Sequence, residues 1–289
     1  MEKNKNYKIW HIVSKVLIYL FLIALAIFII IPFYWMIVTA LKTKAEVELI
    51  PPTLFPKDIA WSNFFSKTKS AFTYNPQARF DIFFKNTIIV AFFSTLGTLI
   101  TTILAAFAFS RLSFKGRDFL FGALLSTMMI PGEMLIITNF VTVSNFGWIN
   151  QFQALIIPFM TSVFYIFFLR QTFKQIPDEL YYAAKVDGTS DFKYLWRIMI
   201  PIGSPTIVTI SILNALGSWN AYIWPNLVTN EVSMRLITNG LNTAFSVDGR
   251  PARNMQMAAS AIVTIPILIL FLLLRKQIMR GVSRSGIKG

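Results

Sequence analysis

The sequence has no cysteine and a single histidine in 289 residues. Without cysteine, the chain has neither disulfides nor a thiolate metal site. The histidine, His11, lies among lysines ahead of the first apolar run, a setting typical of a solvated side chain rather than a ligand. None of the 13 glycines is followed by lysine, so the GxxxxGK[ST] loop that cradles nucleotide phosphates is missing. The chain cannot hydrolyse ATP by that chemistry.

Charge is also scarce. Only 14% of the residues are charged and 55% are hydrophobic, whereas soluble domains carry about 25% charged residues. This balance predicts a polytopic membrane protein. The net charge of +14 could indicate a nucleic-acid partner, but membrane proteins also need excess lysine and arginine for their orientation.

Apolar runs long enough to span a bilayer recur along the chain. A spanning helix needs about 20 mostly apolar residues. The sequence therefore predicts an all-α fold with six transmembrane helices, at about 16–41, 87–110, 119–143, 152–169, 198–223 and 257–274. Within the first run, Ala24-Leu25-Ala26 resembles a signal-peptidase site. Because the apolar run continues through it, we expect an uncleaved spanning helix.

The distribution of positive charge predicts the orientation. If the six helices alternate in direction, most of the 27 lysines and arginines fall on the side of the N-terminus, which favours cytoplasmic termini although the first outer loop is basic. The predicted organisation is a cytoplasmic segment 1–15, a helix 16–41, an outer loop 42–85, a core 86–274 and a cytoplasmic tail 275–289. The core includes a cytoplasmic loop 171–197 and an outer loop 224–256.

The longest polar stretch of the second half, YYAAKVDGTSDFKYLWRIMIP (181–201), predicts two short helices outside the bilayer. Pro177 fits a first helical position, and Asp178 and Glu179 then lie in the first turn, where the helix dipole favours negative charge. Gly188 fits the end of this helix, and either of the two hydroxyl residues after it can cap the next. Pro201 marks the passage into the fifth span.

Each of these helices has one distinctive side. The first has a thin side that lets another surface approach closely, formed by Leu180, Ala183, Ala184 and Asp187. The second has an apolar side, formed by Phe192, Leu195, Trp196 and Met199. Periodicity alone leaves two interpretations open, a loop that packs on its own bundle and a docking site for another protein.

Several motifs, in order and at characteristic spacings, resemble those of ATP-binding-cassette (ABC) importer permeases of the carbohydrate, maltose-transporter type. They are Asn86-Thr87, Ala105–Arg111 (AAFAFSR), Met129-Ile130-Pro131, Pro177–Leu180, Ala183-Ala184, Asp187-Gly188, Ile198–Pro201, Trp219-Asn220 and the tail Gly286–Gly289. The chain is similar to the shorter, six-span subunit of a permease pair. The resemblance implies the type I ABC importer fold, with a cytoplasmic coupling helix pair.

The resemblance also implies how the chain is driven. The polar loop would dock into a groove of the ATPase through Leu180, Tyr182, Ala183, Ala184, Asp187, Gly188 and Pro201. Tyr182 is a departure, because the family has a glutamate there that can contribute a charge contact. The implied partners are a second permease subunit, a pair of ABC ATPases that hold ATP and Mg²⁺, and an extracytoplasmic solute-binding protein. The expected location is the bacterial cell membrane.

Polar residues within the predicted spans mark a candidate substrate path. Glu133 is the one acid inside a span and follows Pro131-Gly132, a pair that can break a helix. It could accept a hydrogen bond from a sugar or pair with backbone groups at the break. Ser211, Asn214 and Ser218 form a polar stripe beside Trp219 and Asn220, which suits a sugar path but also helix packing.

The favoured function is therefore the permease subunit of an ABC importer that moves a sugar or oligosaccharide into the cytoplasm. Permeases for glycerol phosphate, polyamines or peptides share the loop and remain alternatives. An ion-coupled secondary transporter is disfavoured by the single intramembrane acid and the absence of a visible repeat. An intramembrane enzyme is disfavoured because the spans contain no histidine, cysteine or paired carboxylates, and we expect no catalytic or metal site.

Overall fold

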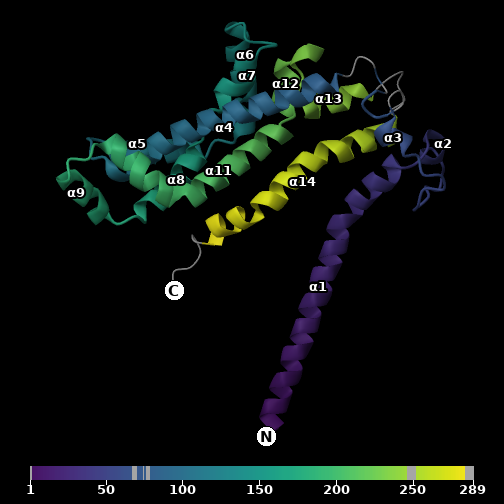
Figure 1. Ribbon diagram of the computed structural model, residues 1–289, viewed down its shortest axis with the longest axis horizontal. Coiled ribbons are helices and arrows are strands. Elements are labelled where there is room, and N and C mark those ends of the chain that lie inside the picture. The colour runs from purple at the N-terminus through teal and green to yellow at the C-terminus, as the bar shows by residue number, and fades with distance from the viewer. Residues whose placement is uncertain (1, 67–69, 74, 76–78, 246–251, 284–289) are drawn as a thin grey trace. The chain divides into compact units, whose positions relative to one another are not determined.

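The computed structural model describes residues 2–66, 70–73, 75, 79–245 and 252–283, and every regular element among them is helical (Figure 1). The all-α prediction is thus confirmed. The chain divides into two compact units, one made of 1–76 with 244–264 and the other of 77–243 with 265–289. The last helix, α14 (Arg253–Ser283), contributes to both.

The first unit contains α1 (Glu2–Ala40), the short helices α2 (Lys44–Val47) and α3 (Ser62–Phe65), and the start of α14. Helix α1 is 39 residues long and retains Pro32 inside it. None of the residues in its most apolar stretch is buried within the described chain. The side chains of this stretch are therefore exposed all round, as expected of a helix that contacts lipid or another subunit.

Buried charges fix the loop that follows α1. The side chain of Lys42 is 2% exposed; its ammonium lies 4.9 Å from the ring centroid of Trp35 and donates a hydrogen bond to the carbonyl of Thr53. The Glu46 carboxylate accepts hydrogen bonds from the Thr53 hydroxyl at 2.7 Å and from the Lys57 amide at 2.9 Å. Because buried charges are costly unless paired, these contacts hold the loop in one conformation.

The second unit contains most of the remaining helices. They are α4 (Phe80–Arg111), α5 (Arg117–Thr127), α6 (Ile136–Asn145), α7 (Phe152–Ile156), α8 (Val163–Lys174), α9 (Asp178–Val186), α10 (Asp191–Tyr194), α11 (Ile200–Asn220), α12 (Ile223–Val228), α13 (Ile237–Ala244) and the rest of α14. Short 3-10 turns cover Gly132–Leu135, Ile157–Phe159 and Val232–Met234, and a π-helical turn covers Leu195–Met199.

Helix α4 forms the centre of this unit, with α8 and α11 packed against it (Figure 1). Its buried side carries small residues at every fourth position, namely Ser94, Thr98, Thr102 and Ala106. Small residues allow neighbouring backbones to approach closely in a membrane, where packing replaces the hydrophobic effect. The Thr98 hydroxyl also donates to the carbonyl of Phe159 at 2.9 Å.

The Asn86-Thr87 motif attaches the segment 233–237 to α4. The Asn86 amide donates to the carbonyls of Ser233 at 2.8 Å and Arg235 at 3.1 Å. The Thr87 hydroxyl accepts a hydrogen bond from the Ile237 amide at 2.8 Å. A polar pair at this point of the helix therefore holds the segment ahead of α13, which explains why an amide and a hydroxyl are useful there.

Two of the six predicted spans are bent rather than straight. The third is α5 followed by Gly132–Asn145, with an 85° bend, and the fourth is Phe152–Phe159 followed by Val163–Lys174, with a 43° bend. Among the described residues, four helices are long and apolar enough to span a membrane, and each bent pair would add one more. The 85° bend falls at Pro131-Gly132, where the sequence predicts a break.

The helix ends also differ from the predicted ones. Helix α4 begins at Phe80 and α14 at Arg253, inside the stretches predicted as outer loops 42–85 and 224–256. Hydropathy misses these first turns because they are polar: Arg79 and Asp81, for example, form an ion pair at 2.9 Å at the start of α4. Helices extend beyond the apolar core of a bilayer, so apolar length underestimates them.

Candidate coupling site and solute cavity

The start of α9 follows the sequence prediction with a shift of one residue. Pro177 has φ −56° and ψ 138° and precedes the helix as its N-cap residue, so it does not occupy the first helical position. Asp178 and Glu179 lie in the first turn as predicted. An extended ψ angle at Pro177 lets the chain turn out of the preceding loop before the helix begins, which accounts for the shift.

Arg111, the last residue of α4, fixes the junction between α8 and α9. Its guanidinium donates to the carbonyls of Phe173, at 2.7 Å, and Ile176, and forms an ion pair with Asp178. The Arg111 side chain is 3% exposed whereas that of Asp178 is 67% exposed. The flat guanidinium can reach several acceptors at once, which a lysine cannot do. The end of α4 thus holds both helices in place.

The end of α9 has the geometry that Gly188 predicts. Gly188 has φ +71° and its amide donates to the carbonyl of Lys185 at 3.0 Å, while the Thr189 amide donates to the carbonyl of Ala184 at 2.9 Å. This pair of bonds is the Schellman motif, in which a left-handed residue closes a helix. The Ser190 hydroxyl then caps α10 by accepting from the Lys193 amide at 3.4 Å.

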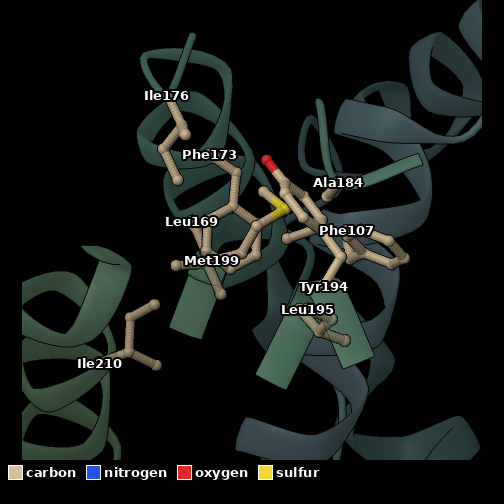
Figure 2. Close-up of a cluster of buried hydrophobic side chains, with 10 residues drawn as sticks. Phe107, Leu169, Phe173, Ile176, Ala184, Tyr194, Leu195, Met199 and Ile210 are labelled. Atoms are coloured by element: carbon tan, nitrogen blue, oxygen red, sulfur yellow. The ribbon is translucent and has the colours of Figure 1, made fainter. Parts of the chain in front are cut away.

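The thin side of α9 does not face one environment. Ala184 is 7% exposed and packs in a core cluster with Phe107 and Tyr194 (Figure 2). Ala183 and Asp187, in contrast, are exposed, as is Leu180 at 42%. One side of α9 therefore packs on its own bundle, as the first interpretation expects. Among the described residues nothing covers the other side, so docking there stays a prediction.

The exposed side of α9 is more apolar than its sequence spacing suggested. Tyr182 is 64% exposed and Val186 is 88% exposed. They are one turn apart, with Ala183 exposed between them. Large apolar side chains gathered on one exposed side are typical of an interaction surface. Tyr182 thus lies on the surface that a partner could contact.

The predicted apolar side of the second helix is wrong in its detail. Leu195 and Met199 are buried at 1% and 0%, but Phe192 and Trp196 are exposed at 62% and 56%, with their rings 6.0 Å apart. The π-helical turn Leu195–Met199 changes the number of residues per turn, so the 3.6-residue spacing fails.

The second helix is also not a separate short helix. Residues Asp191–Trp219 form one continuous helix through the π turn, with Pro201 in the first turn of α11. Proline lacks an amide donor and clashes with the carbonyl four residues before it. The wider π turn immediately before Pro201 accommodates both defects. The coupling loop is therefore continuous with the fifth span.

Most of the predicted path residues line one cavity of ≈ 750 Å³, hereafter the solute cavity. Glu133, Asn214, Ser218 and Asn220 all contribute to its wall. They come from the 3-10 turn after the 85° break and from the C-terminal half of α11. The wall also contains side chains that sequence reasoning missed, namely Ser94, Asn139, Tyr165, Tyr222 and Trp224.

Trp219 and Ser211 lie elsewhere. Both line a separate apolar cavity of ≈ 510 Å³ bordered by α4, α11 and the later part of α14. The ring centroid of Trp219 is 6.1 Å from that of Phe84. Along α11, Ser211, Ala215 and Trp219 recur every four residues on one side of the helix and line the apolar cavity. Asn214 and Ser218 recur on another side and line the solute cavity. The prediction that Trp219 belongs to the substrate path has no support from this placement.

Asn214 has a packing contact in addition to its place in the cavity wall. Its amide donates to the Thr95 hydroxyl of α4 at 3.2 Å. The Ser94 hydroxyl in the same wall is buried and has no hydrogen-bond partner in the described part of the chain. A buried hydroxyl without a partner is uncommon and costs free energy. The wall therefore contains both satisfied and unsatisfied polar groups.

Comparison with known proteins identifies the family. A model described as the binding-protein-dependent transport system inner membrane component matches residues 97–284. The chain belongs to this family. Its members are transport permeases rather than enzymes, and the resemblance inferred from the sequence motifs is confirmed. The match begins within α4 and extends through α14, so it includes α9 and every residue of the solute cavity except Val90 and Ser94.

Named relatives of this permease align along nearly its whole length. The sn-glycerol-3-phosphate transport system permease protein UgpE of Yersinia pestis bv. Antiqua (strain Antiqua) is 30% identical, over 92% of this chain and 95% of that protein. The trehalose/maltose transport system permease protein MalG of Thermococcus litoralis is 30% identical, over 96% and 98%. The arabinooligosaccharides transport system permease protein AraQ of Bacillus subtilis is 27% identical, over 96% and 97%.

A solved structure shares the fold. It is a chain in the crystal structure of a bacterial ABC transporter involved in the import of the acidic polysaccharide alginate. The two chains have a TM-score of 0.77 and 23% sequence identity, with 93% of this permease and 96% of that chain covered. The predicted type I ABC importer fold is therefore confirmed.

Proposed function

We propose that this permease moves a sugar or oligosaccharide into the cytoplasm as one subunit of an ABC importer. The observation that carries the proposal is the solute cavity, whose wall combines amides, hydroxyls and aromatic rings. Sugars present hydroxyls around their edges and apolar faces above and below, so amides and aromatic rings suit them. The sugar-transporting relatives MalG and AraQ support the same solute class.

The charge of the cavity favours a neutral solute over the alternative, glycerol phosphate. UgpE is as similar to this permease as MalG is. Among the described residues of the cavity wall, however, Glu133 is charged and no lysine or arginine is present. A carboxylate repels a phosphate in a site of low dielectric constant, whereas it can accept hydrogen bonds from sugar hydroxyls. This half of the transport path is thus better suited to a neutral sugar.

The energy would come from partner subunits. We infer that two ABC ATPases bind ATP and Mg²⁺, and that one of them contacts the exposed side of α9, including Leu180, Tyr182, Ala183 and Asp187. Gly188 would set the direction in which α9 leaves the bundle, and Ala184 and Pro201 would join it to the rest of the chain. A second permease subunit would complete the path, and an extracytoplasmic binding protein would deliver the solute.

The proposed contact between α9 and an ATPase also implies the orientation of the permease in the membrane. The permease would span the bacterial cell membrane several times, with both termini and the coupling loop 171–197 in the cytoplasm. The domain limits drawn from the sequence, 1–15, 16–41, 42–85, 86–274 and 275–289, remain part of this proposal. Labelling of single introduced cysteines in intact cells would check the orientation directly, because the native chain has none.

The solute assignment can be tested with two serines of one helix. Ser218 lines the solute cavity, whereas Ser211 lines the apolar cavity. The lost hydrogen bond to a sugar should cost about 0.5–1.5 kcal/mol, so Ser218→Val should lower sugar uptake by about two- to tenfold. Ser211→Val should leave it unchanged. Equal effects of the two variants, or faster uptake of glycerol phosphate than of any neutral sugar, would contradict the assignment.

A further inference from the structure

Three side chains meet across the turn that separates α9 from the fifth span. The Asp191 carboxylate accepts a hydrogen bond from the Tyr181 hydroxyl at 2.7 Å and forms an ion pair with Lys185 at 2.6 Å. The Lys185 ammonium also lies 5.4 Å from the ring centroid of Tyr181. These three residues, hereafter the Asp191 cluster, join two residues of α9 to the first residue of α10.

The cluster bridges the turn between α9 and α10, beyond the two backbone hydrogen bonds that close α9 at Gly188 and Thr189. Between Lys185 and Asp191 the chain passes through the left-handed Gly188, and a Cβ added to this glycine would meet nothing within 4 Å. Glycine restricts the backbone less than any other residue. Without side-chain contacts across it, this turn is the place where α9 could change its angle to the fifth span.

Stability does not explain the cluster well. Lys185 and Asp191 are 42% and 40% exposed, and exposed ion pairs add little to the stability of a protein. Burial and the hydrogen bond to Asp191 raise the pKa of Tyr181, and the hydrogen bond to the same carboxylate raises the pKa of Lys185. Both donors therefore stay protonated at neutral pH, and the contacts persist.

The helix on the far side of the turn reaches the solute cavity. From Asp191 the helix is continuous to Trp219, and its first turns are anchored by Tyr194, Leu195 and Met199, each no more than 1% exposed. Figure 2 shows these three side chains within the buried cluster that also contains Ala184. Asn214 and Ser218 of the same helix line the solute cavity.

We propose that Tyr181, Lys185 and Asp191 are positioning residues that hold α9 and the fifth span at a fixed angle, so that movement of α9 is transmitted to the wall of the solute cavity. The proposal rests on the proposed function, because α9 must be moved by an ATPase. A rigid connection transmits displacement, whereas a hinge at Gly188 would absorb it.

The first test measures the angle itself and does not depend on transport. The full chain contains no native cysteine, so spin labels can be attached at Glu179→Cys on α9 and Arg197→Cys on the π turn. Both positions are exposed. We expect Asp191→Asn to broaden the distance distribution between the labels, and Lys193→Met, an exposed lysine nearby, to leave it narrow. An unchanged distribution in Asp191→Asn would overturn the proposal.

The second test measures coupling in the reconstituted importer, as solute molecules transported per ATP hydrolysed. We expect Asp191→Asn and Lys185→Met to lower this ratio by about fivefold, the lower end of common coupling between sites. ATPase co-purification and the melting temperature should stay at wild-type values. Exchange of the two charges, Lys185→Asp with Asp191→Lys, should restore the ratio.

Three results would overturn the proposal: a wild-type ratio in the single variants, no recovery on charge exchange, or loss of ATPase binding in proportion to transport. The last would show that the cluster serves docking. If the wild-type importer transports solute without ATP, the proposed function fails. Only the wild-type measurement can give that result, so it is distinguishable from a failure of the Asp191 cluster proposal.

Discussion

Replacement of Arg111 by methionine tests whether α4 holds the coupling helix. The variant keeps a long side chain but removes the donors to the carbonyls of Phe173 and Ile176, and the ion pair with Asp178. An unsatisfied buried acceptor costs about 1–3 kcal/mol. Because these carbonyls are only partly buried and the Phe173 carbonyl still accepts from the Ile176 amide at 3.2 Å, we take the low end of that range, about 1–1.5 kcal/mol, for each.

The expected local cost is about 2–3 kcal/mol for the two carbonyls together. The exposed ion pair with Asp178 adds about 0–1 kcal/mol at most. The total is about 2–4 kcal/mol, and 1.4 kcal/mol corresponds to a factor of ten, so amide hydrogen exchange in the second turn of α9 should accelerate by roughly 30- to 700-fold in Arg111→Met. Amides in the middle of α11 should not change, because local opening is confined to the released segment.

Two further variants make the test selective. Asp178→Asn removes only the exposed contact and should accelerate exchange by about fivefold or less. Arg111→Lys keeps the charge but cannot reach all three acceptors, so its effect should lie between those of the other two variants. If exchange in α9 were as slow in Arg111→Met as in the wild type, Arg111 would not fix this junction.

Other substitutions test the turn, the packing and the exposed side of α9. Gly188→Val should destabilise the left-handed turn by about 1–2 kcal/mol and reduce ATPase co-purification; normal co-purification and full uptake would count against its role. Gly203→Ala should reduce the free energy of unfolding by about 1–3 kcal/mol, because its Cβ would lie 2.7 Å from the Phe173 ring. The melting temperature should fall accordingly. Gly217→Ala is the matched control, with nothing within 4 Å, and an equal loss there would refute the packing argument. Tyr182→Ala should weaken ATPase co-purification while the melting temperature stays constant, and the opposite pattern would make Tyr182 a structural residue.

Local chemistry made the two ends of α9 predictable. Proline before two acids marks a helix start, and glycine marks a stop, because these effects depend on a few neighbouring residues. Gly188 accordingly has a positive φ angle of 71°. The break at Pro131-Gly132 was predictable for the same reason, although its 85° bend was not.

The sequence could not predict contacts that depend on the packing of distant elements. Phe192 and Trp196 share the spacing of Leu195 and Met199, yet they are exposed, because the π turn alters the period of the helix. The role of Arg111 depends on residues more than sixty positions away along the chain. Its place at the end of the AAFAFSR motif was the available signal.

The residues of the solute cavity were predictable only in part. Asn214 and Ser218 were predictable as a polar stripe, because residues four apart share a helix face. Trp219 was included because it is adjacent in sequence, but it points to another cavity. Asn139 and Tyr165 could not be assigned from the sequence, because the bends in the third and fourth spans bring them to the wall.

The most direct test of the account is whether solute uptake needs ATP. The permease would be reconstituted in liposomes with the proposed second permease, ATPases and binding protein. Uptake of a labelled sugar would then be measured with and without ATP on the ATPase side. The account predicts uptake only with ATP, and none after an ion gradient is imposed in its absence. Uptake driven by an ion gradient in liposomes that lack the ATPases would contradict it.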